Sequence, residues 1–498
     1  MLNCPAEILV LIASYLPVLD KTSLIRVCKT LHQVAEPTLY HEISMEWIQG
    51  YHDNEASVYR AAVKPRIHLL LSRMLVCPEL AKLVKVVRFS GTKFYSHWDS
   101  AATSKLSVDD SKQFTDLVSS FGLAASYRTC EINGRAIIDG EEQPWKRHMA
   151  EGDVDLYQAL VLSQLPNINY LHIGFDPYMG LGYISATLRC ALCSSTDSPE
   201  RSSFRSLFRV DLYAGMFYRD LAELYLQSDG FDMAIAEVLP FFYLPSLQEF
   251  RVAMPVDVEF SWPTIPPCAS ALKILRLQRS HVEVNVLEQL LAVTPHLEIL
   301  EYDFCCRLTD ARSSPFLSSA DFDRALAHVK TTLKILRIAV HFYSNSGDTD
   351  YDDPNPIFGI DGILHSLKDS QSLIEAELPF AMILGPSPQA QSLALPELPP
   401  CLESLTFRDD MALYQSYPWR SGPFLDYLPT CILYWSAHKA NIATIGLNLN
   451  ESLDDWDESA LAAFSTLCHS MHTTPRVHKE LWDCTCPGTP VFAADRFR

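Results

Sequence analysis

The chain has 498 residues, 48% of them hydrophobic, and carries a formal net charge of −20 at neutral pH. This hydrophobic content excludes wholesale disorder, and the length exceeds what one core usually serves, so we expect several domains or a stacked repeat. The acidic balance repels nucleic-acid backbones and anionic lipid, which favours proteins as partners.

The sequence predicts neither a membrane-spanning segment nor a signal peptide. No apolar run approaches the ~20 residues that cross a bilayer, and no basic residue precedes the apolar segment 8–16, as a signal peptide would require. Fourteen scattered cysteines then indicate reduced thiols rather than a disulfide framework. We expect a cytoplasmic or nuclear protein with no nucleic-acid and no membrane partner.

The first forty-odd residues predict a small helical unit. Pro17 is expected to separate two short helices, Asp20 to cap the second, and Pro37 to break the chain again. The apolar residues at helical spacing are Ile8, Leu9, Ile12 and Leu16 in the first helix and Leu24, Val27, Cys28 and Leu31 in the second. Leu11 and Tyr15 lie off this stripe, so the unit has more apolar surface than it can bury, and we expect a partner.

The residues of this unit resemble an F-box: Pro5-x-Glu7-Ile8-Leu9-x-x-Ile12-x-x-Tyr15-Leu16, then Leu24, Val27-Cys28-Lys29 and Leu39-Tyr40. In that family the motif docks on a Skp-type adaptor, which links the protein to a cullin-based ubiquitin ligase, while the rest of the chain selects a protein substrate. The resemblance implies that the Skp-binding face, or the small core beneath it, consists of Pro5, Ile8, Leu9, Ile12, Leu16, Leu24, Val27 and Leu31. The alternative for the same residues is a three-helix cap on a larger domain.

From residue 84 onward, a pattern of the form apolar-x-x-apolar-x-apolar recurs ten times. The copies are Val84, Val87, Phe89; Ile168, Leu171, Ile173; Leu207, Val210, Leu212; Leu247, Phe250, Val252; Leu272, Leu275, Leu277; Leu297, Leu300, Tyr302; Leu333, Leu336, Ile338; Leu373, Ala376, Leu378; Leu402, Leu405, Phe407; and Ile442, Ile445, Leu447. Subtracting the numbers of successive first residues after Ile168 gives steps of 25 to 40 residues. The short steps match a repeat of about 20 to 29 residues with one strand and one helix, and the long steps imply inserted segments.

This pattern is similar to irregular leucine-rich repeats, so the expected fold class is α/β: a small all-α F-box followed by a solenoid of short parallel strands with outer helices. The last two apolar residues of each copy flank one outward residue and point into the core. An amphipathic return helix is indicated by Val286, Leu287, Leu290 and Leu291. The alternative is chance recurrence of apolar strands in an ordinary α/β protein.

The expected domains are an F-box at 1–45, a helical connector at 46–83, the solenoid at 84–450 and a C-terminal cap or tail at 451–498. Residues 84 to 168 are the weakest part of the pattern and leave room for a loop, a hidden repeat or a small insertion. As a whole, the chain resembles fungal-type F-box proteins with leucine-rich repeats.

The outward residues of successive strands suggest two interpretations of the substrate face. These residues are Arg251, Arg276, Glu301, Arg337 and Glu377. In the first interpretation they form a self-satisfied ladder of alternating charge from Arg276 to Glu377. In the second, Arg251 and Arg276 stand together with no acid between them and bind a carboxylate or phosphate on a substrate, with Tyr213 and His172 extending the contact.

Motifs for catalysis and metal binding are not recognisable. Phosphate-cradling, hydrolase-elbow and metalloprotease motifs are missing. The acidic segment 344–356 lacks the glycine and glutamate that a calcium-binding EF-hand loop needs. A zinc site from Cys468, His469, His472, His478, Cys484 and Cys486 has no familiar spacing, so ordinary thiols and surface histidines are favoured.

We therefore expect no catalytic residue, no metal and no cofactor. The expected role is a non-catalytic substrate adaptor of a ubiquitin ligase. A leucine-rich-repeat interaction scaffold without a ligase role is the alternative, and the two differ only in the first forty residues.

Overall fold

The structure is a computed structural model, and it divides into two compact units. The first unit comprises residues 1–215, 232–247 and 262–265, and the second comprises 216–231, 248–261 and 266–498. The structure describes residues 4–48, 51–53, 58–60, 65–92, 108–120, 144–175, 182–193, 204–214, 235–254, 260–280, 282–307, 316–343, 359–388, 395–410, 417–438, 442–450 and 456–480.

The first unit combines helices with a parallel sheet. Its sheet has the strand order β1-β4-β5-β6, formed by β1 (Glu42–Ile48), β4 (Val86–Thr92), β5 (Tyr170–Phe175) and β6 (Arg209–Ala214). A separate antiparallel pair is formed by β2 (Tyr51–Asp53) and β3 (Val58–Arg60). The helices are α1 (Ala6–Ser14), α2 (Val18–Leu24), α3 (Lys29–Tyr40), α4 (Ile67–Val76), α5 (Pro78–Leu83), α6 (Val108–Ser120), α8 (Pro144–Glu151), α9 (Val154–Ser163), α10 (Gly182–Leu192), α12 (Ile235–Val238) and η3 (Leu239–Tyr243).

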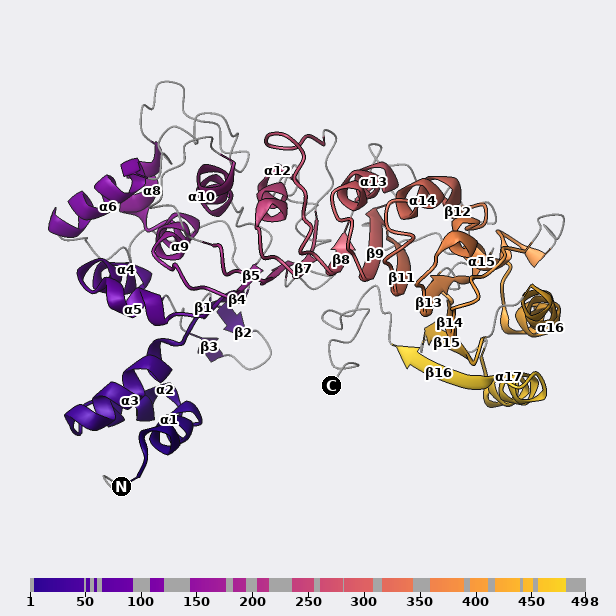
Figure 1. Ribbon diagram of the computed structural model, residues 1–498, viewed down its shortest axis with the longest axis horizontal. Coiled ribbons are helices and arrows are strands. Elements are labelled where there is room, and N and C mark those ends of the chain that lie inside the picture. The colour runs from indigo at the N-terminus through magenta and orange to yellow at the C-terminus, as the bar shows by residue number, and fades with distance from the viewer. Residues whose placement is uncertain are drawn as a thin grey trace. The chain divides into compact units, whose positions relative to one another are not determined.

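The second unit is a longer parallel sheet with helices between its strands. The strand order is β7-β8-β9-β11-β13-β14-β15-β16, formed by β7 (Glu249–Val252), β8 (Ile274–Ser280), β9 (Ile299–Arg307), β11 (Ile335–Tyr343), β13 (Glu375–Pro379), β14 (Ser404–Arg408), β15 (Thr444–Asn450) and β16 (Thr474–Glu480). A two-stranded parallel sheet is formed by β10 (Phe316–Ser318) and β12 (Gly359–Asp361). The helices are α13 (Val284–Ala292), α14 (Ser319–Leu326), η4 (Ser366–Asp369), α15 (Phe380–Leu384), α16 (Ser421–Ala437) and α17 (Glu458–Ser470). In Figure 1, α13 and α14 lie on one side of β8, β9 and β11.

A backbone hydrogen-bonding pattern repeats from strand to strand and fixes the register of neighbouring strands. The carbonyl just before one strand accepts the two N–H groups that open the next: Gln248 O accepts from Lys273 N and Ile274 N at 2.9 and 3.0 Å. The same arrangement recurs at the carbonyls of Lys273, Glu298, Lys334, Ile374 and Glu403. Each strand therefore begins at the same level as its neighbour, and the register aligns equivalent side chains.

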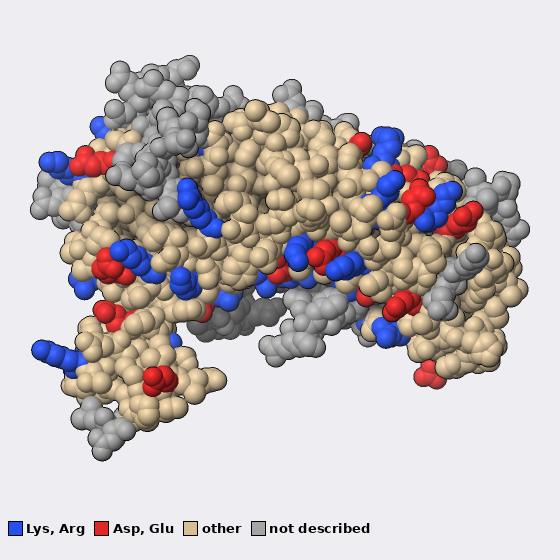
Figure 2. All heavy atoms as spheres, in the orientation of Figure 1, with Lys and Arg blue, Asp and Glu red and all other residues tan. Residues whose placement is uncertain are grey.

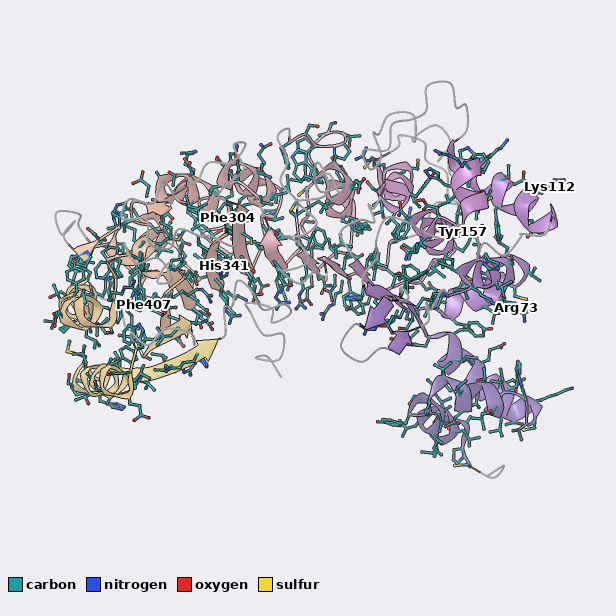
Figure 3. All side chains as sticks on the ribbon, turned by 180° about the vertical axis from the view of Figure 1, so that it is seen from behind. Arg73, Lys112, Tyr157, Phe304, His341 and Phe407 are labelled. Carbon is teal, nitrogen blue, oxygen red and sulfur yellow. The ribbon has the colours of Figure 1, made fainter. Side chains whose placement is uncertain are left out.

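The last two apolar residues of each of the ten copies lie on a strand and are buried, and the first one precedes that strand. The expected return helix is α13, which buries Val286, Leu287, Leu290 and Leu291. Side chains alternate between the faces of each strand. In Figure 3, Phe304 on β9 lies toward the helices and His341 on β11 lies toward the opposite face.

The sheets also include strands that the pattern did not indicate. Strand β1 precedes residue 84 and buries Ile43 and Trp47, and β16, preceded by α17, continues the second sheet beyond residue 450. The segment 46–83, expected to be a helical connector, holds α4 and α5 together with the β2–β3 pair. Within residues 84 to 168, the structure describes the helices α6, α8 and α9. The acidic segment 344–356 lies outside the described residues.

Candidate functional site

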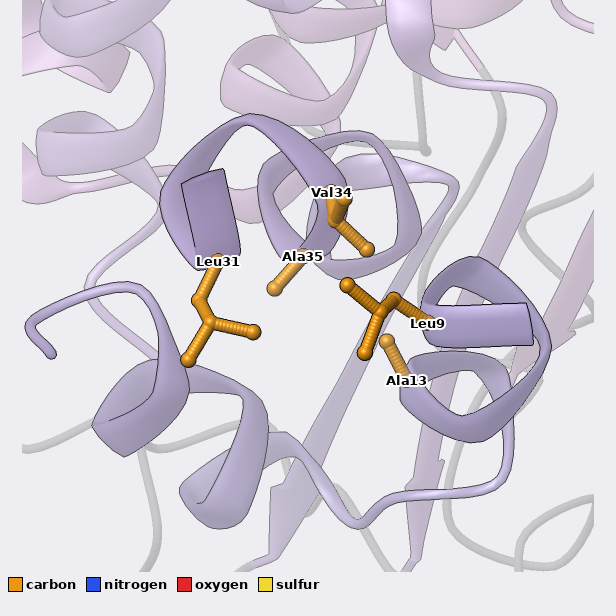
Figure 4. Packing of buried hydrophobic residues seen from close by; sticks show 5 residues of the cluster. All are labelled: Leu9, Ala13, Leu31, Val34 and Ala35. Atoms are coloured by element: carbon orange, nitrogen blue, oxygen red, sulfur yellow. The ribbon is translucent and has the colours of Figure 1, made fainter. Parts of the chain in front are cut away.

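Helices α1, α2 and α3 enclose a small apolar core at the start of the chain. Its five buried side chains are Leu9, Ala13, Leu31, Val34 and Ala35 (Figure 4). Cys4, Leu24, Ile25 and Cys28 pack against this cluster while remaining partly exposed. Leu9 and Ala13 are four positions apart, so they share one face of α1, and this face is the one that turns toward α3.

The helices of this unit differ from the prediction at three points. The predicted second helix is divided, because α2 ends at Leu24 and Leu31 lies on α3. Helix α2 begins at Val18, directly after Pro17, so Asp20 lies inside the helix and is not its N-cap. Helix α3 continues through Pro37 to Tyr40. Proline removes only one backbone donor and here falls in the second half of the helix, so the remaining turns still form.

The opposite face of α1 is apolar and exposed. Ile8, Leu11, Ile12 and Tyr15 follow the spacing of one helical stripe, and Tyr15 is 82% exposed. The other large exposed apolar side chains of this unit are Val10, Val18, Leu19 and Val27, the last in the turn between α2 and α3. We call the eight residues Ile8, Val10, Leu11, Ile12, Tyr15, Val18, Leu19 and Val27 the apolar outer surface.

Two hydroxyl groups close to this surface are bonded to carbonyls of their own helices. Ser14 Oγ donates to the carbonyl of Leu11 at 2.7 Å, and Thr22 Oγ1 donates to the carbonyl of Val18 at 2.7 Å. Figure 2 shows few charged side chains over the lobe that α1, α2 and α3 form in Figure 1. An exposed apolar cluster of this kind is typical of interaction surfaces.

The eight predicted Skp-binding residues separate into three groups by exposure. Pro5, Ile8, Ile12 and Val27 are exposed, whereas Leu9 and Leu31 are buried in the core. Leu16 and Leu24 are half-buried. The grouping of α1 into one main stripe with Leu11 and Tyr15 outside it is wrong, because Leu9 faces inward and Ile8, Leu11, Ile12 and Tyr15 share the outer face.

The arrangement of three short helices with a buried core and an apolar outer face can be compared with known families. Residues 2–46 match the F-box-like family. This is an F-box-like domain. Searches of curated proteins and of solved structures found no match for the chain. An F-box-like domain suggests in general the role of a non-catalytic ubiquitin ligase adaptor, and such domains generally bind Skp-type adaptors.

The outward face of the second sheet carries an alternating ladder of charge. Arg276 Nε lies 2.8 Å from Glu301 Oε2, and Arg337 Nη1 lies 2.8 Å from Glu301 Oε1. Arg337 Nε lies 3.7 Å from Glu377 Oε2. The predicted ladder from Arg276 to Glu377 is therefore present. It extends one strand further through an ion pair between Glu377 and Arg408.

These ladder charges are buried and mutually compensated. The side chains of Arg276, Arg337 and Arg408 are 12%, 7% and 0% exposed. Burial alone would raise the pKa of Glu377, but Arg408, Asn448 and Arg337 outweigh it and hold the pKa of this carboxyl below its usual range. Their charges are directed at each other rather than at solvent.

The expected cationic spot at Arg251 and Arg276 has an acid beside both arginines. The two residues are register partners, as predicted. Glu249, two residues before Arg251 on the same face of β7, forms an ion pair with Arg276 and lies 4.0 Å from Arg251 Nη2. The prediction that no acid lies between them is wrong, because it considered only one outward residue on each strand and Glu249 is a second one.

The outward face of the first sheet is more open. Tyr170 on β5 lies between Arg88 on β4 and Arg209 on β6, with guanidinium carbons 4.8 and 5.0 Å from its ring centroid. His172, predicted to contact substrate, lies on the same face, and its Nε2 lies near Gly174. Tyr213 belongs to β6, but its side chain lies outside the described residues. None of Arg88, Tyr170 and Arg209 was selected from the sequence, because the search considered a single outward position on only some of the strands.

A third polar cluster combines residues within β9 and β11 with the end of β14 and the segment that follows it. Asp410 Oδ2 accepts a hydrogen bond from Val340 N at 2.9 Å, and Arg408 Nε lies 3.0 Å from Asp410 Oδ1. His341 Nε2 lies 3.5 Å from Asp303 Oδ1. Burial raises the pKa of Asp410 to about 7, with Asp303 contributing in the same direction.

Within the described parts of the chain, no group of three histidine, cysteine or acidic side chains is arranged to hold a metal ion. Of the predicted zinc candidates, Cys468 is buried in α17 and His478 lies on β16. Cys484 and Cys486 lie outside the described residues. Among the described helices, none is both long and apolar enough to span a membrane.

Proposed function

We propose that this chain is the substrate-recognition subunit of a Skp–cullin–F-box ubiquitin ligase. Its F-box-like domain docks on a Skp-type adaptor, which connects it to a cullin, and its parallel sheets bind a protein substrate. The subunit itself is non-catalytic and acts in the cytoplasm or nucleus. The F-box-like match over residues 2–46 is the observation that carries this proposal.

The geometry of the domain supports docking through the apolar outer surface. Leu11 and Tyr15 are 53% and 82% exposed, whereas Leu9 and Ala13 on the other face of the same helix are buried in the core. Burying a large apolar side chain stabilises a complex by about 1.5–3 kcal/mol. Eight such side chains on α1, on α2 and in the turns that follow them make an adaptor interface that is mainly hydrophobic. Among the predicted contacts, Ile8, Ile12 and Val27 belong to this surface, while Leu9 and Leu31 maintain the core.

The repeating strands support a recognition role for the rest of the chain. Equivalent side chains are aligned across the strands by the repeated backbone contact, which produces extended outward faces. We assign residues 84–450 to irregular leucine-rich repeats on the basis of the recurring apolar pattern. Arg251, Arg276, Tyr213 and His172 remain proposed substrate contacts, with Glu249 as a competing partner for both arginines.

Leu11→Asp tests docking without disturbing the core. The substitution places a charge in the centre of an apolar contact and should weaken binding to a purified Skp-type adaptor at least about tenfold. Binding is measured by titration of the full chain with the adaptor. Val76→Asp is the matched control, because Val76 is an exposed apolar residue (67%) on α4 outside the F-box-like domain. This variant should bind the adaptor with the affinity of the wild type.

Leu9→Asp separates loss of the surface from loss of the fold. Leu9 is 4% exposed, so a charge there should unfold the domain as well as abolish binding, whereas Leu11→Asp should retain the helical signal of the wild type. If the wild-type chain does not bind a Skp-type adaptor, the ligase role is rejected. The alternative, a repeat scaffold that has no ligase role, would then be the remaining function. Normal binding by Leu11→Asp would move the docking surface away from α1.

A further inference from the structure

Arginine side chains on the two outward sheet faces differ sharply in accessibility. In the second unit, Arg276, Arg337 and Arg408 are at most 12% exposed and enclosed by acids. In the first unit, Arg88 and Arg209 are 41% and 35% exposed. The arginines of the first sheet are therefore more accessible to a partner than those of the ladder.

Tyr170 holds these two arginines in fixed positions. It lies on the strand between theirs, with both guanidinium groups within 5.0 Å of its ring centroid. Its Oη donates to Asp211 Oδ2 at 2.6 Å and accepts from Arg88 Nη1 at 3.3 Å. Stacking and hydrogen bonding restrict the three side chains before any ligand arrives, which lowers the entropy cost of binding.

The acids around the stack do not shield both arginines equally. Arg209 Nη2 lies 3.3 Å from Asp211 Oδ2, but the Asp211 side chain is only 3% exposed. Arg88 Nε lies 2.8 Å from Glu42 Oε1, and Glu42 is 47% exposed at the side of the stack. Among these four side chains, a partner approaching the face meets two accessible guanidinium groups and one accessible carboxylate, which favours an anionic partner group.

We propose that Arg88, Tyr170 and Arg209 form a binding site for an acidic segment of the protein substrate. This inference rests on the proposed function and names the chemistry of the partner. The guanidinium carbons lie at most 9.8 Å apart, the sum of 4.8 and 5.0 Å. In an extended peptide, residues two apart project from the same side at a separation of about 6.6–6.8 Å. Two carboxylates with this spacing can each pair with one arginine.

Fluorescence polarisation with defined peptides tests the site. The probe is a labelled Gly/Ser peptide with Glu at two positions separated by one residue, and its control carries Gln at both positions. The full-length wild type should bind the Glu peptide at least about tenfold more tightly than the Gln peptide. Arg88→Gln and Arg209→Gln should each remove most of this difference, because each deletes one charged contact.

Matched variants distinguish the site from general electrostatics. Arg324→Gln removes a 58% exposed arginine from α14 and should leave peptide binding unchanged. Tyr170→Leu keeps both charges but removes the stack, so it should weaken binding of the Glu peptide. Equal binding of the Glu and Gln peptides, or full binding by the double variant Arg88→Gln/Arg209→Gln, would overturn the site. Binding only when the acids are replaced by phosphoserine would overturn the carboxylate assignment.

Adaptor binding provides the independent readout. The Arg88 and Arg209 variants should bind the Skp-type adaptor as the wild type does, because they lie outside the F-box-like domain. A wild type that binds the Skp-type adaptor but does not prefer the Glu peptide over the Gln peptide would reject this inference alone. Failure of the wild type to bind the adaptor would instead reject the ligase role.

Discussion

Arg337 Nη1 lies 2.8 Å from Glu301 Oε1 on the neighbouring strand, and both side chains are almost fully buried. Glu375 and Glu377 approach the same guanidinium from the other side, with Glu375 Oε1 2.7 Å from Arg337 Nη2. Burial would lower the pKa of Arg337, but Glu375, Glu301 and Glu377 more than offset this and raise it. One arginine therefore compensates acids from two adjacent strands.

Arg337→Met should destabilise the second unit strongly. The substitution leaves buried Glu301 and Glu377 without their central cation, and breaking a buried ion pair in this way costs about 3–5 kcal/mol. Chemical denaturation at pH 7 measures the change in free energy of unfolding. Arg324→Met removes an exposed arginine that pairs with Asp321 and should cost no more than about 1 kcal/mol. Similar losses for the two variants would contradict the role given to the ladder.

Asp410 should make stability fall as pH rises toward neutrality. Burial raises the pKa of this carboxyl to about 7 in the folded chain from an ordinary value of 3.8, so the folded state favours the protonated form. The resulting stability is fully present below the pKa of the unfolded chain and is lost as pH rises through about 7. Asp410→Asn retains an acceptor for Val340 N–H but cannot ionise.

The measurement is the free energy of unfolding at pH 5, 6 and 7.5. The Asn variant should gain stability relative to the wild type as pH increases over this range. The stability contribution of Glu377 depends on pH in the opposite direction, because its pKa is lowered and the contribution is lost on acidification. It is present in both proteins and cancels in the comparison. A difference that does not change with pH would show that Asp410 does not titrate in this range.

Gly446 should tolerate no side chain while Thr406 occupies the neighbouring strand. The two residues are register partners on β15 and β14, and a Cβ on Gly446 would lie 3.1 Å from both Cβ and Cγ2 of Thr406 and closer still to its Oγ1. Gly446→Ala should therefore cost about 1–3 kcal/mol through overpacking. Adding Thr406→Ala removes Oγ1 and Cγ2, so the double variant should lose less stability than the sum of the two single variants.

The control for this pair is Gly422→Ala. A Cβ at Gly422 meets no atom within 4 Å, and the residue lies in the first turn of α16. Alanine is favoured over glycine in a helix, so this variant should be neutral or slightly stabilising. Equal destabilisation at Gly422 and Gly446 would indicate a backbone effect rather than a clash with Thr406.

The strand pattern was determined by the sequence because it depends on local alternation. Leu300 and Tyr302, like the other repeated pairs, flank one outward residue, and this period of two persists whatever lies around the strand. The F-box-like domain was recognisable for a similar reason, since Pro5, Ile8 and Leu9 occur in a short contiguous order. Strand β16 was missed because Pro475 and Val477 form too short a pattern to distinguish from surrounding residues.

Only the tertiary structure decided which groups meet. Helical spacing placed Ile8 and Leu9 together, but the position of α3 determined that Leu9 faces the core and Ile8 faces outward. Likewise, the sequence indicated that Arg251 and Arg276 are adjacent, whereas the direction of the Glu249 side chain placed an acid beside both. The accessible stack of Arg88, Tyr170 and Arg209 combines three strands separated by up to 121 residues, by subtraction of 88 from 209, and no local pattern reports such a contact. The periodicity of a sequence shows which residues share one face of a helix or strand, but tertiary packing decides what that face contacts.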